Sequence, residues 1–216
     1  MSDLFAGRDE KFQRAIAAID AANADDPFTC VVRGEVRPKE LGHAELMCEW
    51  VSRLDPEADD WQLLAARAHH LRRWESPRSA EPEGRAGYLR WRTAARKRHA
   101  ELVGQLLRDV GYSDDDVERV QRIVNKEGLG KGDLADIDGR APVVQTHEDA
   151  LCLVFLETQF NETAEKLGDE KTIDVLARTL VKMGPRGRQA ALTLSFDPPR
   201  AALVQAALAK VAESTP

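Results

Sequence analysis

The segment LLAARAHHL, residues 63–71, decides how this chain is expected to fold. Its leucines and alanines favour a helix, and the small alanine side chains let such a helix pack closely against its neighbours. Two adjacent histidines, His69 and His70, lie near the end of the segment. The segment therefore predicts a helical core with polar side chains at a place where apolar ones are usual.

Helical periodicity continues on both sides of this segment through nearly the whole chain. Breaks such as Asp55-Pro56 and capping residues such as Ser113 mark the helix ends. Helices are predicted over residues 9–23, 39–54, 59–74, 87–110, 114–126, 146–168, 171–183 and 199–213. No strand pattern is apparent, and residues 31–39 are expected to form a loop with at most a short extended piece. The prediction is an all-α, single-domain helical bundle over residues 1–216, with a core at about 9–195 and a C-terminal helix at about 199–213.

Two later segments are expected to lie outside the helices. Residues 127–144 are rich in glycine and aspartate, which predicts a loop, and residues 183–188 resemble a helix C-cap followed by a turn. The glycines of the first segment lack the spacing of a phosphate-binding loop. His147, beside Glu148 at the start of a predicted helix, is expected to be exposed.

The composition argues against several classes of protein. The chain has 216 residues, 31% of them charged, and no apolar run of roughly 18 residues, so no membrane association is expected. No secretory signal is visible, and three scattered cysteines fit a cytoplasmic protein without disulfides. A net charge of −6 argues against a nucleic-acid binder. Residues 67–108 nevertheless carry eleven Lys and Arg against four Asp and Glu, which predicts either a site for a small anionic substrate or a solvated basic helix face.

Polar side chains on apolar helix faces are the main indication of chemistry. His43, His99 and Asp149 each line up with apolar residues of their own predicted helix, and His69 and His70 add two imidazoles. A buried carboxylate is destabilising unless it is paired, and a divalent metal bound by imidazole and carboxylate offsets that cost. The pattern predicts a metal site. The alternatives are hydrogen-bonded core histidines and, for Asp149, an acid in the first turn of its helix.

The order of these residues resembles the HD-domain superfamily, which comprises all-helical metal-dependent phosphohydrolases and their relatives, including diiron oxygenases. In that superfamily a histidine precedes a His-Asp dyad, two further histidines follow in some members, and an aspartate comes last. The resemblance implies that His43 and His69 are the first two metal ligands and that Asp149 is the last. His70 stands where the superfamily has its dyad aspartate.

The same resemblance bears on the number of metals. His99 matches the first additional histidine of the two-metal members, whereas Asn125 and Lys126 occupy the region of the second. A histidine at position 70 cannot bridge two metals as an aspartate does. We therefore expect one divalent transition metal (Zn, Fe, Mn or Ni), held by His43, His69, His70 and Asp149, and no full second site. His99 would relay a proton, and Lys126 would hold an anionic group in the space of a second ion.

Longer strings resemble a second family. AHHLRRWESPR, GYLRWR, HAELVGQLLRDVGY and EDALCLVFLE together are similar to the uncharacterised domain-of-unknown-function family number 4202, over residues 12–194. That resemblance implies no activity.

Arginines beside aromatic rings follow the histidine pair. Guanidinium groups bind phosphate or carboxylate in a bidentate manner, and Trp and Tyr faces stack on flat rings. The residues predicted to bind a substrate are Arg72, Arg73, Trp74, Arg78, Tyr88, Trp91 and Arg92. The alternative is that Trp74 and Trp91 anchor the core and that the arginines pair with surface glutamates.

Together, the residues and the resemblance favour an HD-like metal-dependent hydrolase. The expected activity is that of a phosphohydrolase acting on a small phosphorylated or nucleotide-like substrate through a metal-bound water. Two alternatives stay open: a non-catalytic helical module that binds a ligand or protein at a degenerate HD site, and an iron-dependent oxygenase variant.

Overall fold

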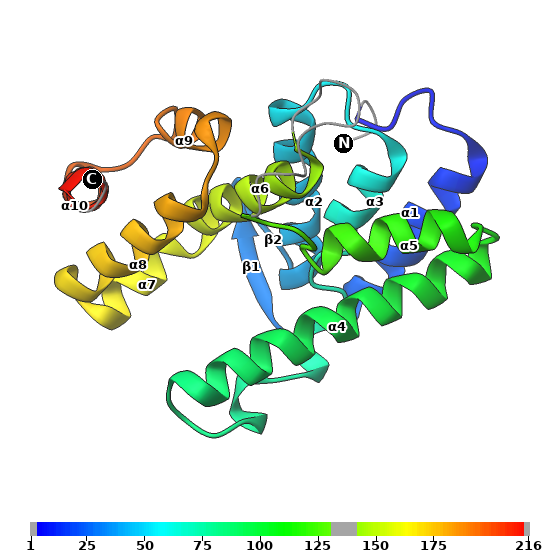
Figure 1. Cartoon of the computed structure of the whole chain (residues 1–216), viewed down its shortest axis with the longest axis horizontal. Helices are drawn as coiled ribbons and strands as arrows, with labels where there is room; N and C mark the ends of the chain where they lie inside the picture. The colour runs from blue at the N-terminus through cyan, green and yellow to red at the C-terminus, as the bar shows by residue number, and fades with distance from the viewer. Residues whose placement is uncertain (1–3, 131–141, 214–216) are drawn as a thin grey trace. The chain divides into compact units, whose positions relative to one another are not determined.

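The computed structural model describes residues 4–130 and 142–213 (Figure 1). Helices make up almost all of its regular structure, which confirms the all-α prediction. The chain divides into two compact units, Met1–Gly128 and Leu129–Pro216, and each is described by itself. None of the helices among the described residues is long and apolar enough to cross a lipid bilayer.

The first unit is built from a set of packed helices: α1 (Glu10–Ala24), α2 (Lys39–Leu54), α3 (Asp60–Arg67), α4 (Arg85–Val110) and α5 (Asp114–Val124). In Figure 1 the long α4 and α5 lie beside each other, and α3 packs against both α2 and α5. Aspartate and serine N-caps start α1, α3 and α5, and the left-handed Gly111 ends α4. The predicted range 39–54 coincides with α2.

A buried ion-pair network joins three of these helices. Arg67 at the end of α3 is 1% exposed, and its guanidinium donates Nη2–H to Asp20 Oδ2 on α1 at 2.7 Å. Its Nη2 also lies 3.9 Å from Glu45 Oε1 on α2. Burial raises the pKa of Glu45. Burial alone would lower the pKa of Arg67, but the hydrogen bonds that Arg67 donates to Asp20, together with nearby negative charges, raise it, so Arg67 stays charged. The network fixes α3 relative to α1 and α2, and so it fixes the point at which the chain leaves α3.

The predicted third helix is wrong in its C-terminal part. The structure ends α3 at Arg67, and the chain then turns through His69 and His70 before two short 3-10 helices, η1 (Arg73–Glu75) and η2 (Arg78–Ala80). Arg72 has a left-handed backbone (φ 51°), and the Asn23 side chain on α1 accepts its N–H at 3.1 Å. A side chain distant in sequence thus stabilises this turn, which local periodicity does not reveal.

The absence of strands was also a wrong expectation. Strands β1 (Thr29–Val32) and β2 (Glu35–Pro38) form an antiparallel hairpin in which Thr29 pairs with Pro38 and Val32 with Glu35. The two turn residues, Arg33 and Gly34, both have positive φ, as a tight hairpin turn requires. The hairpin packs on α2 at Gly42, where a Cβ would lie 2.9 Å from Val32 Cγ2. The second strand of the hairpin ends at Pro38, and α2 begins at the next residue, so the hairpin leads directly into the first turn of α2.

The second unit contains the remaining helices: α6 (Val143–Thr158), α7 (Phe160–Leu167), α8 (Asp169–Lys182), α9 (Pro185–Ala191) and α10 (Pro198–Glu213). The predicted helix 146–168 is two helices separated at Gln159, and the segment predicted as a turn at 183–188 begins α9. Proline at the first position of α9 suits a helix start. Residues 131–141 of the predicted loop 127–144 lie outside the described residues.

Candidate metal centre

The first turn of α2 presents two ligand-type side chains on one face. Glu40 and His43 are three residues apart, which places them one above the other on a helix. The N–H of Glu40 has no acceptor within the helix and donates to Asp26 Oδ2 at 2.9 Å, while Asp26 Oδ1 accepts the N–H of Phe28. Asp26 therefore fixes the start of α2, and with it the position of the Glu40 carboxylate.

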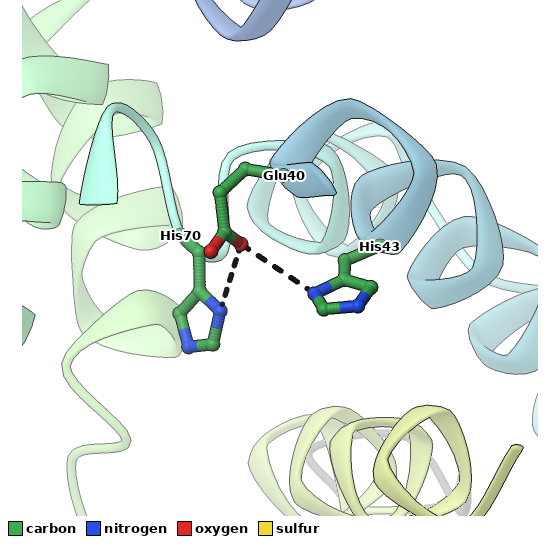
Figure 2. Close-up of side chains that lie close together, drawn as sticks. All are labelled: Glu40, His43 and His70. Carbon is green, nitrogen blue, oxygen red and sulfur yellow. Dashed lines mark hydrogen bonds and ion pairs between the residues drawn. The ribbon is translucent and has the colours of Figure 1, made fainter. Parts of the chain in front are cut away.

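The turn after α3 brings a third ligand to this face (Figure 2). The His70 ring points at the Glu40 carboxylate, with Nδ1 3.2 Å from Oε2, and His43 Nδ1 lies 3.6 Å from the same oxygen. The three ligand atoms all lie within 4.8 Å of one another. Neighbouring ligands on a tetrahedral zinc ion would be about 3.3 Å apart, given metal–nitrogen bonds of about 2.0–2.1 Å. These side chains fit a divalent metal ion with little movement.

Burial favours the neutral form of His70, which is the form that a metal requires. Glu40 and His43 are each 5% exposed. The pKa of His70 is lowered well below its usual value, first by burial and then by the positive charge of Arg73. His99, His43 and Lys126 lower it further. A neutral histidine keeps one nitrogen lone pair for a metal, whereas the imidazolium has none.

His99 lies close to this centre. Its ring is 5.7 Å from the His70 ring, measured between centroids, and its Nδ1–H donates to the carbonyl of Leu71 at 2.9 Å. Burial lowers the pKa of His99 to about 4. Within the described part of the chain, Nε2 of His99 has no hydrogen-bond partner. His99 is thus a neutral, fixed side chain, and its predicted role as a proton relay stays a prediction.

Two other predicted residues are buried near these histidines. The His69 ring lies 4.0 Å from the His70 ring between centroids, but His69 does not belong to the three-residue cluster that could hold a metal. Lys126 is 7% exposed in a left-handed conformation (φ 54°), and its charge contributes to the lowered pKa of His70. Their predicted roles in metal and anion binding stay predictions.

Asp149 belongs to the second unit, where it has a clear structural partner. Its Oδ1 accepts the N–H of Gly184 at 2.8 Å and the side-chain amide of Gln145 at 2.8 Å, and its Oδ2 accepts the N–H of Gly187 at 3.2 Å. The carboxylate thus caps the N-terminus of α9. Burial raises the pKa of Asp149. The predicted role of Asp149 as a metal ligand stays a prediction.

The predicted substrate-binding residues fall into two groups. Arg78 donates to the carbonyls of Glu81 and Pro82 and so holds its own loop, and Arg72 lies 3.7 Å from a carboxylate oxygen of Glu75. Trp74 and Arg92 are half-buried. The second group gathers near the candidate metal centre and consists of Arg73, Tyr88 and Trp91.

Arg73 links this second group to the histidines. Its Nη1 donates to His70 Nε2 at 2.9 Å, and its guanidinium lies over the Trp91 ring at 4.8 Å from the centroid. The Tyr88 ring is 6.0 Å from the Trp91 ring, and Trp91 Nε1–H donates to the carbonyl of Ser76 at 2.8 Å. Burial lowers the pKa of Arg73. Of the predicted substrate-binding residues, Arg73 is the one with a hydrogen bond to a candidate metal ligand.

Sequence reasoning missed Glu40, the residue whose carboxylate lies next to both His43 and His70. The signal was available, because Glu40-Leu41-Gly42-His43 has the Glu-x-x-His spacing by which one helix supplies two metal ligands. His147 was expected to be exposed, and that expectation is wrong, since His147 is 1% exposed in α6, as is the neighbouring Glu148.

The fold and the cluster together describe an all-α protein with a candidate His/Glu metal centre. The chain belongs to the family described as "Domain of unknown function (DUF4202)", whose model matches residues 13–204, which confirms the more specific resemblance. No curated protein and no solved structure matches the chain. The HD-domain likeness stays a prediction.

Proposed function

We propose that Glu40, His43 and His70 hold one divalent transition metal and that the protein is a metal-dependent hydrolase of small phosphorylated or nucleotide-like substrates. The observation that carries this proposal is the convergence of two imidazoles on one buried carboxylate, with ligand atoms within 4.8 Å of one another. Two histidines and one glutamate are a ligand set of catalytic zinc sites, which leave a coordination position for water. A bound metal lowers the pKa of that water and so supplies a nucleophile near neutral pH.

The surrounding side chains support an anionic substrate. Two cations bring positive charge to the centre. Arg73 lies over the face of Trp91, and Lys126 is close enough to His70 to lower its pKa. A phosphoryl group is stabilised by such cations as its charge develops during transfer. Tyr88, 46% exposed and beside Trp91, offers a face on which a nucleobase can stack. In this proposal Arg73 and Lys126 bind the phosphoryl group, and Tyr88 and Trp91 orient the rest of the substrate.

The same ligand set favours a second candidate, an iron-dependent oxygenase. Two histidines and one carboxylate also form the facial triad of non-haem Fe(II) oxygenases. The two activities differ in their requirement for oxygen: hydrolysis proceeds under anaerobic conditions, and oxygenation does not. A non-catalytic binding module is the third reading, and it predicts a protein that binds ligand but turns over no substrate.

Metal analysis of the purified full-length protein and its variants tests the proposal. We expect near-stoichiometric metal in the wild type after reconstitution. Glu40→Gln and His43→Ala should each bind the metal roughly a hundredfold more weakly or worse, because each substitution removes a direct ligand. Glu49→Gln is the matched control, since Glu49 lies on the same helix but pairs with Arg33. Unchanged metal content in Glu40→Gln would overturn the metal centre. If no reconstituted metal form hydrolyses phosphate esters or nucleotides, the proposed hydrolase activity is wrong.

A further inference from the structure

We propose that Arg73 is a binding site for a phosphate-type oxyanion and that this anion and the metal promote each other's binding through the His70 ring. The inference rests on the proposed metal centre and adds a regulatory coupling to it. Its physical origin is a conflict between two hydrogen-bonding arrangements of one histidine.

The first arrangement is the one in the structure. A guanidinium has only donors, so the 2.9 Å contact from Arg73 Nη1 makes His70 Nε2 an acceptor. The proton of the neutral ring is therefore on Nδ1, where it donates to Glu40 Oε2 at 3.2 Å. The His70 ring thus accepts a hydrogen bond from Arg73 and donates one to Glu40. In this arrangement the nitrogen that faces Glu40 and His43 has no lone pair for a metal.

The second arrangement is the one that a metal requires. A metal between Glu40, His43 and His70 needs the lone pair of the His70 nitrogen that faces them, which is Nδ1. The single proton of the neutral ring must then move to Nε2, and an N–H at Nε2 would face the N–H of Arg73. Metal binding and the Arg73–His70 hydrogen bond therefore exclude each other. The ring stays neutral throughout, so the competition concerns which nitrogen carries the proton.

Arg73 released from His70 is suited to an oxyanion. Within residues 4–130 and 142–213 its side chain forms no ion pair with a carboxylate, and His70 and Trp91 are its polar and aromatic contacts. The side chain is half-buried, and burial of a guanidinium without a counter-ion is costly. Two parallel N–H···O bonds to a phosphate would relieve that cost. Lys126, whose positive charge lowers the pKa of His70, adds to the positive charge around the same ring and so favours an anion beside Arg73.

The two binding events are consequently linked. An anion that takes Arg73 away from His70 frees Nε2 to carry the proton, and Nδ1 then offers its lone pair to the metal. By thermodynamic reciprocity, metal bound at Nδ1 raises the affinity for the anion by the same factor. Couplings of this kind change affinities by about 5–150-fold.

The test measures the affinity of the full-length protein for Ni²⁺ by calorimetry, with and without saturating inorganic phosphate. For the wild type we expect about tenfold tighter Ni²⁺ binding in phosphate. Arg73→Met keeps an apolar stem against Trp91 but cannot donate to His70, so it should bind Ni²⁺ more tightly than wild type without phosphate and lose the effect of phosphate. Arg98→Met is the matched control for lost charge, because Arg98 lies on the neighbouring α4 and pairs with Glu75.

The tautomer of His70 provides a readout that needs no metal. The ¹⁵N chemical shifts of the ring should report Nδ1–H in the free protein and a shift toward Nε2–H when phosphate is added. Ni²⁺ binding that is unaffected by phosphate, or an Arg73→Met variant that behaves as Arg98→Met, would overturn the coupling while leaving the metal centre intact. Absence of Ni²⁺ binding in all variants would instead overturn the metal centre, and the coupling with it.

Discussion

At the scale of single residues, His70 and His99 are held in the neutral form by burial. His99 shows this most directly, since it is 1% exposed and its Nδ1–H is fixed by the carbonyl of Leu71. The pKa of His99 falls from an ordinary 6.5 to about 4. Burial is also the main reason why the pKa of His70 is lowered. Both groups therefore favour the folded state at neutral pH and oppose it in acid.

The lowered pKa of His99 predicts acid sensitivity. The unfolded chain takes up a proton at His99 near pH 6.5, whereas the folded protein does so only near pH 4. The stabilisation is therefore present above pH 6.5 and is lost as the pH falls toward 4. Between pH 7.5 and pH 5 we expect a loss of roughly 2 kcal/mol in the free energy of unfolding from this residue alone.

Urea unfolding of chelator-treated protein at the two pH values measures this loss. The His99→Gln variant should show a smaller difference between the two pH values than the wild type, even though it is less stable at both. Equal pH dependence in the two proteins would show that His99 does not titrate abnormally.

At the scale of secondary-structure elements, short junctions position the functional groups. Asp26 fixes the start of α2, the left-handed Arg72 shapes the turn after α3, and Asp149 fixes the start of α9. Each junction depends on a side chain from another part of the chain. For this reason substitutions at the junctions should act more strongly than substitutions within the exposed faces of the helices.

The junction between Asp149 and α9 supplies a specific prediction. A Cβ added at Gly187 would lie 2.4 Å from Asp149 Cγ, so Gly187→Ala must displace the carboxylate from the N–H groups that it accepts. We expect a loss of roughly 2–3 kcal/mol in stability, from overpacking together with weakened hydrogen bonds. Thermal unfolding, with hydrogen exchange of the amides of α9, measures it. Gln189→Ala, at an exposed position of the same helix, is the control, and equal behaviour of the two variants would contradict the proposed close contact.

At the scale of the whole molecule, the chain consists of two compact units, and the candidate metal ligands Glu40, His43 and His70 all lie in the first. A ligand that binds only the native form of a unit stabilises that unit by mass action. At a free metal concentration of 100 times Kd, this stabilisation is about 2.7 kcal/mol.

Hydrogen exchange of the full-length protein should show where the metal acts. We expect added metal to slow exchange most in α2 and around residues 69–71, and least in α8 and α10, because units with separate cores open separately. Mass-spectrometric exchange with and without chelator measures the difference. Slowing of exchange confined to the second unit would contradict a metal centre at Glu40, His43 and His70.

The sequence by itself determined the helical class, the bounds of α2 and the burial of His43, His99 and Asp149. Helical periodicity and capping are local properties, so residues 39–54 could be assigned without knowledge of their neighbours. The spacing of Glu40 and His43 was equally local, and recognition of the Glu-x-x-His pattern would have identified Glu40.

Only the tertiary structure decided which imidazoles meet that carboxylate. His70 is thirty residues from Glu40 in sequence, and it reaches Oε2 because α3 ends at Arg67 and the chain turns back at Arg72. That turn depends on an acceptor from α1, and the position of α3 depends on a buried ion pair with Asp20. These contacts join segments far apart along the chain, so their free energy is gained only when the helices pack, and no local pattern reveals it.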